Sequence, residues 1–332
     1  MRISIIGAGS FGTSMAIVAA RAGHDVLLWA HDPSVAEGIR RERRNPVYMP
    51  SVELDPHIGA THSLAEAAEF SDSLLMVVPS HHYRRVLTEL LPHVARADVI
   101  SGTKGIENES LETMSQVTAQ VLGDKLRAFA VLSGPTFALE AARGDPTVAV
   151  VASKEDDFAS AAQGMLSGGT FRLYRTNDVN GVELAGSLKN VIAIAAGVLE
   201  GLGLGSNTNA ALVTRGLHEM TKLGIALGGR LETFAGLAGM GDLVLTCTGA
   251  LSRNRRVGVE LGRGKTLEQI LGETREVAEG VKTAKAAQAL AERHGIEMPI
   301  TTEMYRVLYE GETPRAAIQR LMTRSLKAEF AR

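Results

Sequence analysis

The sequence predicts an α/β fold with a doubly wound sheet in its N-terminal part and an all-α C-terminal domain. Three observations carry this prediction. The 332 residues exceed what one hydrophobic core comfortably holds, so two domains are expected. Buried-strand patterns alternate with helical patterns up to about residue 180, and only helical patterns follow. We therefore expect a sheet domain over residues 1–182 and a helical domain over residues 183–332.

Six short runs in the first part are apolar without the alternation of a half-exposed strand, which is typical of strands buried on both faces of a parallel sheet. These runs are residues 3–6, 26–29, 74–78, 99–101, 128–132 and 147–151. Helices predicted over residues 12–22, 82–91 and 111–122 have the length that right-handed crossovers require. A parallel sheet with helices on both faces follows.

In the second part, apolar residues recur at helical spacing. The predicted helices cover residues 184–199, 211–226, 267–270, 284–294, 303–308 and 315–324. Within the first of them, the apolar stretch of residues 190–199 is bounded by Lys189 and Glu200, and we expect it to be too short to span a bilayer. No membrane insertion is predicted.

The bulk composition narrows the function classes. With 45% apolar and 22% charged residues the chain is an ordinary globular protein, and its formal net charge of −2 offers no broad basic surface for nucleic acid. A single cysteine, Cys247, excludes an internal disulfide and points to a reducing compartment. The chain has no CxxC or HExxH motif, so no metal site is expected. Because the N-terminus starts with a strand and not with a secretory leader, we expect a cytoplasmic protein.

Residues 7–12, GAGSFG, directly follow the first strand and open a helix, which is the context that a GxGxxG dinucleotide fingerprint requires. Gly7 permits the tight turn, Gly9 lets the backbone approach a pyrophosphate, and Gly12 lets the helix pack closely on the strand. Free N–H groups at the helix start would face the phosphates. The alternative is a glycine-rich turn without a ligand. The motif predicts that the sheet is Rossmann-like and that the protein binds NAD or NADP.

The end of the second strand leaves the choice between NAD and NADP open. Asp32 lies about where an acidic residue binds the ribose hydroxyls of NAD, whereas His31 could meet a 2′-phosphate. Asp32 followed by Pro33 is equally typical of a helix cap with proline in the first turn.

Three loops leave predicted strands at the edge where open α/β sheets bind ligands: residues 79–81, 102–105 and 133–138. Lys104, between two glycines, is predicted to project into the cleft, the alternative being an exposed loop lysine. Residues 133–138 could offer backbone N–H groups to the cofactor or substrate, or form an ordinary turn.

Lys189 is the strongest catalytic candidate. It is the only charged side chain between Glu183 and Glu200, on an otherwise apolar helix. A buried lysine needs a partner, and burial moves its pKa toward values useful for proton transfer. The alternative is a lysine that reaches solvent at the flank of the helix.

Further along, Asp242 follows a glycine-rich segment and supplies a carboxylate. Ser252, Arg253 and Asn254 combine hydroxyl, guanidinium and amide groups, which suit a phosphate. A helix that starts at Ser252 would add free N–H groups toward the same anion. The alternative is a capped basic helix that faces solvent.

Taken together, these stretches resemble the bacterial-type NAD(P)-dependent sn-glycerol-3-phosphate dehydrogenases. The matching segments run in family order across nearly the whole chain: residues 7–12, 45–50, 103–107, 133–138, 187–191, 238–243, 252–254, 277–280 and 297–300. The resemblance implies a reversible NAD(P)H-dependent reduction of dihydroxyacetone phosphate to sn-glycerol 3-phosphate for phospholipid synthesis, with NADPH slightly favoured.

The resemblance also implies roles for individual residues. Lys189 would donate the proton in reduction and accept it in oxidation, and Lys104 and Asp242 would complete the catalytic group. The implied substrate-binding residues are Lys104, Gly134, Thr136, Lys189, Asp242, Ser252, Arg253 and Asn254. The implied cofactor-binding residues are Gly7, Gly9, Ser10, Phe11, Gly12, His31, Lys104, Ala138, Arg253, Val277 and Glu279. His31 stands where the family often has arginine, which weakens any inference about the 2′-phosphate.

Two other functions stay open at this point: a related dehydrogenase for a non-phosphorylated hydroxy acid, and a non-catalytic protein that senses dinucleotides. Residues 252–254 favour a phosphorylated substrate, and the two lysines favour catalysis. A homodimer is expected, because two-fold symmetry is the commonest oligomeric arrangement.

Overall fold

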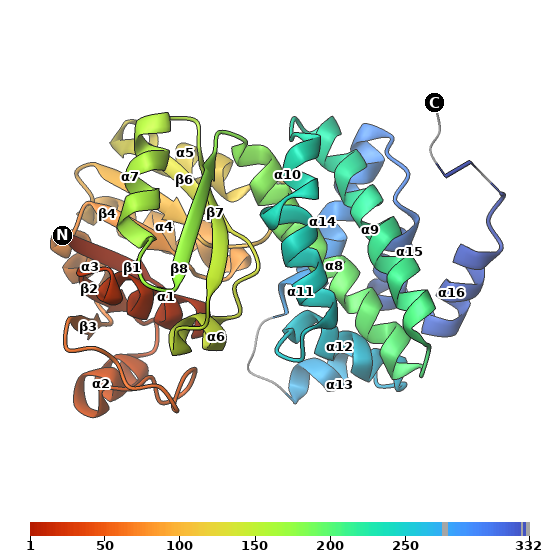
Figure 1. Ribbon diagram of the computed structural model, residues 1–332, viewed down its shortest axis with the longest axis horizontal. Coiled ribbons are helices and arrows are strands. Elements are labelled where there is room, and N and C mark those ends of the chain that lie inside the picture. The colour runs from red at the N-terminus through yellow and green to blue at the C-terminus, as the bar shows by residue number, and fades with distance from the viewer. Residues whose placement is uncertain (274–277, 327, 330–332) are drawn as a thin grey trace.

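The computed structural model describes residues 1–273, 278–326 and 328–329. Figure 1 shows a half built around a sheet beside a half built of helices. The strands are β1 (Arg2–Ile6), β2 (Asp25–Trp29), β3 (Ile58–Thr61), β4 (Ser73–Met76), β5 (Ala97–Ser101), β6 (Leu126–Ser133), β7 (Thr147–Ser153) and β8 (Phe171–Thr176). They form one sheet in the order β3-β2-β1-β4-β5-β6-β7-β8. The predicted α/β fold class, doubly wound sheet plus helical C-terminal domain, is confirmed.

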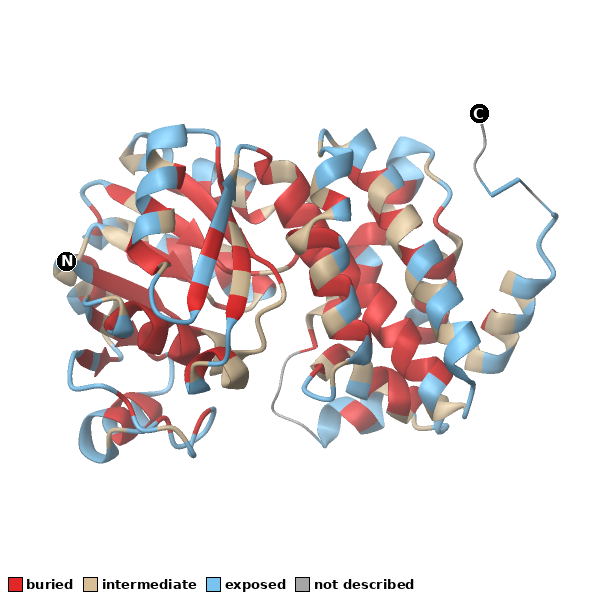
Figure 2. Cartoon of the chain, viewed as in Figure 1, coloured by how far each residue is buried: buried red, intermediate tan, exposed pale blue. Residues whose placement is uncertain are grey.

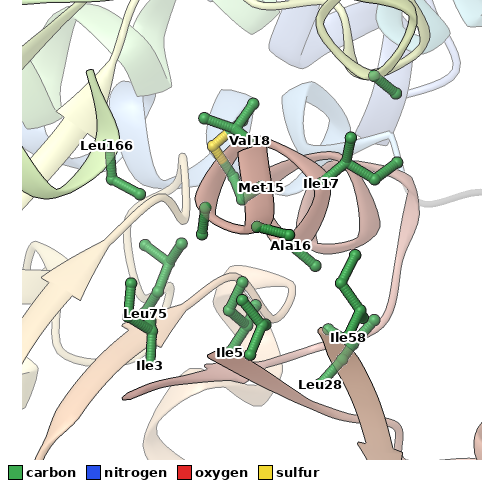
Figure 3. Packing of buried hydrophobic residues seen from close by; sticks show 14 of the residues in the cluster. Ile3, Ile5, Met15, Ala16, Ile17, Val18, Leu28, Ile58, Leu75 and Leu166 are labelled. Carbon is green, nitrogen blue, oxygen red and sulfur yellow. The ribbon is translucent and has the colours of Figure 1, made fainter. Parts of the chain in front are cut away.

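Helices connect these strands. They are α1 (Ser10–Arg21), α2 (Pro33–Glu42), α3 (Leu64–Phe70), α4 (Ser80–Leu90), α5 (Met114–Leu122), α6 (Ala138–Arg143) and α7 (Asp156–Leu166), with the short turns η1 (Leu91–His93) and η2 (Gly123–Lys125). Figure 3 shows α1 packed on the sheet, with Met15 and Ala16 over Ile5 of β1 and Leu28 of β2. This packing holds the start of α1 at the carboxyl end of β1.

Two strands were missed by the sequence analysis. β3 has only four residues and includes Gly59, and β8 alternates between buried and exposed side chains. Neither is a continuous apolar run, because each lies at an edge of the sheet where one neighbour is absent. Neither edge strand therefore has the sequence pattern of a strand buried on both faces.

The sheet also departs from the parallel arrangement that was predicted, because β7 runs antiparallel to β6. The six-residue helix α6 lies between these strands. Such a helix spans about 9 Å, whereas the seven residues of β7 extend over roughly 23 Å. Because α6 is too short to carry the chain back along the sheet, the next strand enters in the opposite direction.

The helical half contains α8 (Val179–Gly201), α9 (Ser206–Ala226), α10 (Leu231–Ala235), η3 (Leu237–Gly241), α11 (Asp242–Thr248), α12 (Arg253–Gly262), α13 (Leu267–Gly272), α14 (Glu279–His294), α15 (Pro299–Tyr309) and α16 (Pro314–Met322). The last strand ends at Thr176, and the predicted domain boundary after residue 182 falls in the first turn of α8. The turn η3 is π-helical.

Helix α8 is the centre of this half. It is longer than the predicted apolar stretch, since it starts at Val179 and has 23 residues. By length and composition alone, this helix could cross a bilayer. The expectation that it is too short was therefore wrong. Figure 2 shows it buried along its course, and every residue of its most apolar 18-residue window is buried inside the protein. Its apolar character is explained by the helices packed around it.

The backbones of α8 and α12 touch because glycines face each other. A Cβ at Gly197 would lie 1.9 Å from the carbonyl oxygen of Arg255, and one at Gly258 would lie 1.9 Å from that of Ile194. Any larger residue would push the two helices apart. This crossing brings the start of α12 beside the middle of α8, where Asn254 Nδ2 donates to Asn190 Oδ1 at 2.9 Å.

Candidate functional site

A cavity of about 780 Å³ opens where the two halves meet. The sheet half contributes the loops that follow β1, β2, β4, β5 and β6, and the helical half contributes α8, α11 and the starts of α12 and α14. The sequence-predicted residues that line it are Gly7, Gly9, Ser10, Phe11, His31, Lys104, Thr136, Ala138, Lys189, Asp242, Ser252, Arg253, Asn254 and Glu279. Segments far apart in the sequence therefore form one cleft.

The loop of residues 7–12 has the backbone that a dinucleotide cradle requires. Gly7 has a φ of +124°, a conformation that favours glycine. A Cβ at Gly12 would lie 1.8 Å from the carbonyl oxygen of Gly7, so only glycine lets α1 start this close to β1. Among the described residues, no atom outside Gly9 and its two chain neighbours lies within 4 Å of the Cβ position at Gly9. The wall at Gly9 is thus bare backbone, which fits close approach of a pyrophosphate.

A buried asparagine braces this loop. Asn45 is fully buried, and its Nδ2 donates to the carbonyl oxygen of Ala8 and to Thr13 Oγ1, both at 2.8 Å. Its Oδ1 accepts from the backbone of Tyr48 at 3.0 Å. One amide thus ties residues 45–48 to the glycine loop. In the sequence, this segment is marked only by the family resemblance.

At the end of β2, Asp32 is the N-cap of α2. Its Oδ1 accepts from Ser34 N at 2.8 Å and from Ser34 Oγ at 2.7 Å, and Pro33 is the first helical residue. The helix-cap alternative for this residue is therefore confirmed. His31 is exposed on the wall of the cavity.

Lys104 leaves the end of β5 and crosses to the helical half. Its Nζ donates to Asp242 Oδ2 at 2.6 Å and to the carbonyl oxygen of Gly134 at 3.1 Å. The side chain is 19% exposed, so the exposed-loop alternative was wrong. Gly134 itself does not line the cavity. Its carbonyl oxygen also accepts from Thr136 Oγ1 at 3.1 Å. Gly134 therefore orients Lys104 and Thr136, which do line the cavity.

Lys189 meets the same carboxylate from the other side. Its Nζ donates to Asp242 Oδ1 and, at 2.7 Å, to Thr246 Oγ1. The side chain is only 6% exposed, so the alternative of a lysine that reaches solvent was wrong. Thr246 was missed by the sequence analysis, and the only signal for it was its position one helical turn after Asp242.

Two ammonium groups on one buried carboxylate shape the electrostatics of the site. Burial lowers the pKa of Lys189 to about 8; the charge of Asp242 opposes this shift, whereas the charge of Lys104 adds to it. Burial raises the pKa of the Asp242 carboxyl, but the charges of Lys104 and Lys189 outweigh burial and hold that pKa below its ordinary value. Asp242 is thus an anion that fixes both lysines, and Lys189 can lose or gain a proton near neutral pH.

The candidate phosphate-binding residues lie at the start of α12. Ser252 caps this helix by accepting from Arg255 N at 3.2 Å, which confirms the predicted helix start. Ser252 and Asn254 are buried in the wall of the cavity, and burial lowers the pKa of Arg253. The alternative of a helix facing solvent was wrong for these three residues. Asn254 Oδ1 also accepts from Gly280 N at 2.9 Å.

Three predicted cofactor residues remain, Glu279, Ala138 and Val277, and they differ in their positions relative to the cavity. Glu279 lines the cavity, but its carboxylate accepts from Ser80 N at 3.0 Å and from Ser80 Oγ at 2.5 Å, at the start of α4. It therefore links the two halves. Ala138 begins α6 on the cavity wall. Val277 lies outside the described residues.

Comparisons with known proteins give one family for both halves of the chain. Family models described as the N-terminus and the C-terminus of NAD-dependent glycerol-3-phosphate dehydrogenase match residues 2–159 and 178–319. The glycerol-3-phosphate dehydrogenase [NAD(P)+] of Geobacter sulfurreducens is 53% identical over 99% of this chain and 98% of its own. That of Trichlorobacter lovleyi is 51% identical over the whole length of both chains. The crystal structure of glycerol-3-phosphate dehydrogenase from Coxiella burnetii superposes with a TM-score of 0.93, at 40% identity, over 97% of this chain and 99% of that one.

The predicted enzyme class and the prediction of NAD or NADP as cofactor are thereby confirmed. The chain belongs to the NAD(P)-dependent glycerol-3-phosphate dehydrogenase family of oxidoreductases.

Proposed function

We propose that the protein catalyses the reversible reduction of dihydroxyacetone phosphate to sn-glycerol 3-phosphate, with Lys189 as proton donor in reduction and proton acceptor in oxidation. The observation that carries the proposal is the pair of ammonium groups, from Lys104 and Lys189, held on Asp242 at the wall of the cavity. One lysine comes from each half of the protein. A carbonyl oxygen placed between them would meet positive charge as it becomes an alkoxide.

The dinucleotide fits the sheet side of the cavity. Residues 7–11 and Ala138 line that side, and the bare backbone at Gly9 leaves room for a pyrophosphate. A reduced nicotinamide supplies the hydride when it is bound. The proposed cofactor-binding residues are Gly7, Gly9, Ser10, Phe11, Gly12, His31, Lys104, Ala138, Arg253, Val277 and Glu279.

The substrate phosphate is proposed to bind at the start of α12. Arg253 provides a planar donor group that matches phosphate oxygens, and Ser252 and Asn254 flank it on the cavity wall. Gly134 and Thr136 would hold the other end of the substrate near Lys104 through the contacts described above. This arrangement favours a phosphorylated substrate over a neutral hydroxy compound.

Proton transfer then follows from the position of Lys189. With a pKa of about 8, the buried amine is mostly protonated near neutral pH and can still give up its proton at moderate free-energy cost. Asp242 keeps the ammonium oriented, and Thr246 accepts a second hydrogen bond from it. Lys104 would place a second positive charge beside the same developing alkoxide.

The test is an absorbance assay at the reduced-nicotinamide band, with NADPH and NADH in turn. Dihydroxyacetone phosphate should be reduced, whereas dihydroxyacetone should react at a rate lower by about tenfold or more, because it lacks the charged hydrogen bonds to Arg253. Equal rates for both substrates would contradict the proposed phosphate site. No oxidation of either cofactor would contradict the reaction itself. The role in phospholipid synthesis, the homodimer and the cytoplasmic location stay predictions.

A further inference from the structure

We propose that Arg84 is a positioning residue for the reaction, because it holds the loop of residues 104–113 where Lys104 reaches Asp242. The inference rests on the proposed function, in which Lys104 acts on the substrate carbonyl. Arg84 belongs to α4 and is not among the described residues that line the cavity. It would therefore act on the reaction only through the loop.

The loop of residues 104–113 lies between β5 and α5 and reaches from the sheet half into the helical half. Lys104 donates to Asp242 of α11. Ile106 is 2% exposed and belongs to the hydrophobic core of the helical half, against which Leu111 also packs. One side of the loop is thus held by the helical half, so its position relative to the sheet depends on a second anchor.

The loop has a fixed shape of its own. Glu107 N donates to the carbonyl oxygen of Glu112, and Leu111 N donates to that of Glu107, both at 2.9 Å. Ile106 and Thr113 form an antiparallel bridge across the loop. Leu111 has a φ of +63°, which in the described part of the chain it shares as a non-glycine residue only with Arg43. For a bulky side chain this backbone is strained, and it persists only where the surroundings over-determine it.

Helix α4 supplies the second anchor through one face. Ser80 and Arg84 lie one turn apart on this face. A Cβ at Gly105 would lie 2.4 Å from Ser80 Cβ, so the loop backbone passes directly over the start of α4. Arg84 Nε donates to Glu107 Oε1 at 2.9 Å, and its Nη2 donates to Glu107 Oε2 at 2.8 Å and to Glu112 Oε2 at 2.9 Å. One guanidinium therefore joins both limbs of the loop to α4.

These ion pairs differ from an ordinary surface pair. The carboxylate side chains of Glu107 and Glu112 are only 17% and 23% exposed, and Ser110 Oγ also donates to Glu107 at 2.6 Å. A bidentate arginine within a network of charges is the arrangement in which ion pairs contribute measurably. The Arg84 guanidinium holds the pKa of Glu107 below its ordinary value, so this pair stays charged at the pH where Lys189 titrates.

Lys189 reports on the position of Lys104. The charged and titratable groups that act on Lys189 are Asp242 and Cys247 of α11 and Lys104 of the loop. Burial lowers the pKa of Lys189, and the charge of Lys104 lowers it further. If the loop loosens and Lys104 leaves Asp242, the amine of Lys189 loses a repelling neighbour and keeps its carboxylate. The pKa of Lys189 should then rise above about 8.

The experiment follows the Cε resonance of Lys189 in protein labelled with carbon-13 lysine, over about pH 6 to about pH 10. The resonance is identified as the one that is missing from Lys189→Arg. Arg84→Gln should raise the pKa of Lys189 by about 0.5 or more, and it should lower kcat for dihydroxyacetone phosphate by about tenfold or more. Arg84→Lys, which keeps one ion pair but not the bidentate one, should give intermediate values. An unchanged pKa in the folded Arg84→Gln variant would overturn the proposal, even if its Tm is lower.

Glu107→Gln separates the loop from a direct effect of charge. Loss of a positive charge at Arg84 would by itself raise the pKa of Lys189, whereas loss of a negative charge at Glu107 would lower it. A loosened loop predicts a rise in both variants. A rise in Arg84→Gln with a fall in Glu107→Gln would show that the two residues act only by their charges, and the proposal would fail.

Arg127→Gln is the matched control. Arg127 is 44% exposed and donates through Nε and Nη2 to the two carboxylate oxygens of Asp98, at 2.7 Å and 2.6 Å. It lies at the start of β6, whereas the cavity is lined by residues that follow the end of this strand. Its loss should leave the pKa of Lys189 and kcat unchanged.

The positioning role and the proposed function fail separately. A raised Lys189 pKa in Arg84→Gln, without any turnover of dihydroxyacetone phosphate by the unaltered protein, would contradict the function and leave the positioning of Lys104 standing. Turnover by the unaltered protein, with the same kcat and the same Lys189 pKa in Arg84→Gln, would support the function and contradict the positioning role.

Discussion

Raising the pH of the assay tests the proposed role of Lys189 most directly. Burial lowers the pKa of this residue from 10.5 to about 8, a difference that corresponds to about 3 kcal/mol against the charged form. Reduction needs the protonated amine as donor, so kcat/KM for dihydroxyacetone phosphate should be level below this pKa and fall about tenfold per pH unit above it. Oxidation of sn-glycerol 3-phosphate needs the neutral amine, so its kcat/KM should rise through the same pH range.

Two titratable neighbours of Lys189 have pKa values far from 8. Burial raises the pKa of the Cys247 thiol to about 12, and the pKa of Asp242 lies below its ordinary value. A phosphate monoester has its second pKa near about 6. A break close to pH 8 is therefore assigned to Lys189.

The variant Asp242→Asn sharpens this assignment. It removes the negative charge that raises the pKa of Lys189 and leaves the charge of Lys104, which lowers it. The break should therefore move to lower pH in any turnover that remains. Stopped-flow measurements over about pH 6 to about pH 10 would follow both directions of the reaction. A reduction rate that stays level up to the ordinary lysine pKa would refute the reasoning, as would a break of the same sign in both directions.

Three further predictions concern single side chains. Lys189→Ala should lower kcat by about 10²–10⁴-fold while dinucleotide fluorescence still reports binding; normal turnover by the folded variant would contradict the proton-transfer role. Arg253→Ala should raise KM for the phosphorylated substrate by about 10- to 150-fold, which corresponds to about 1.5–3 kcal/mol for a lost charged hydrogen bond, and an unchanged KM would place the phosphate elsewhere. Asn45→Ala removes the donor to Ala8 and Thr13, so the Kd of the dinucleotide should rise more than kcat falls. A lower Tm with an unchanged Kd would show that Asn45 acts only on stability.

Much of the site was predictable from the sequence because its parts have local signatures. The glycine spacing at residues 7–12, next to a strand and a helix, predicted the dinucleotide loop. An isolated charge on an apolar helix marked Lys189, and a Ser-Arg-Asn run at a helix start marked residues 252–254. Each of these signals lies within a few residues along the chain, where backbone conformation and burial leave a direct pattern.

Other features have no local signature. The edge strands β3 and β8 escaped because their burial depends on neighbours in the sheet, and the direction of β7 depends on the short connection before it. The length of α8 was underestimated because its first turns pack against the sheet half, which no periodicity within the helix reveals. Thr246 and Asn45 are ordinary residues in sequence, and only their hydrogen bonds give them importance.

The sequence by itself determined the six inner strands, most of the longer helices and the nucleotide loop, because continuous apolar runs, helical spacing of apolar residues and glycine spacing are patterns within short stretches of chain. Only the tertiary structure decided that Lys104, Lys189 and Asp242 meet, and that Asp32 caps a helix. Electrostatic forces act through space and not along the chain. The protonation of Lys189 therefore depends on residues that lie far apart in the sequence.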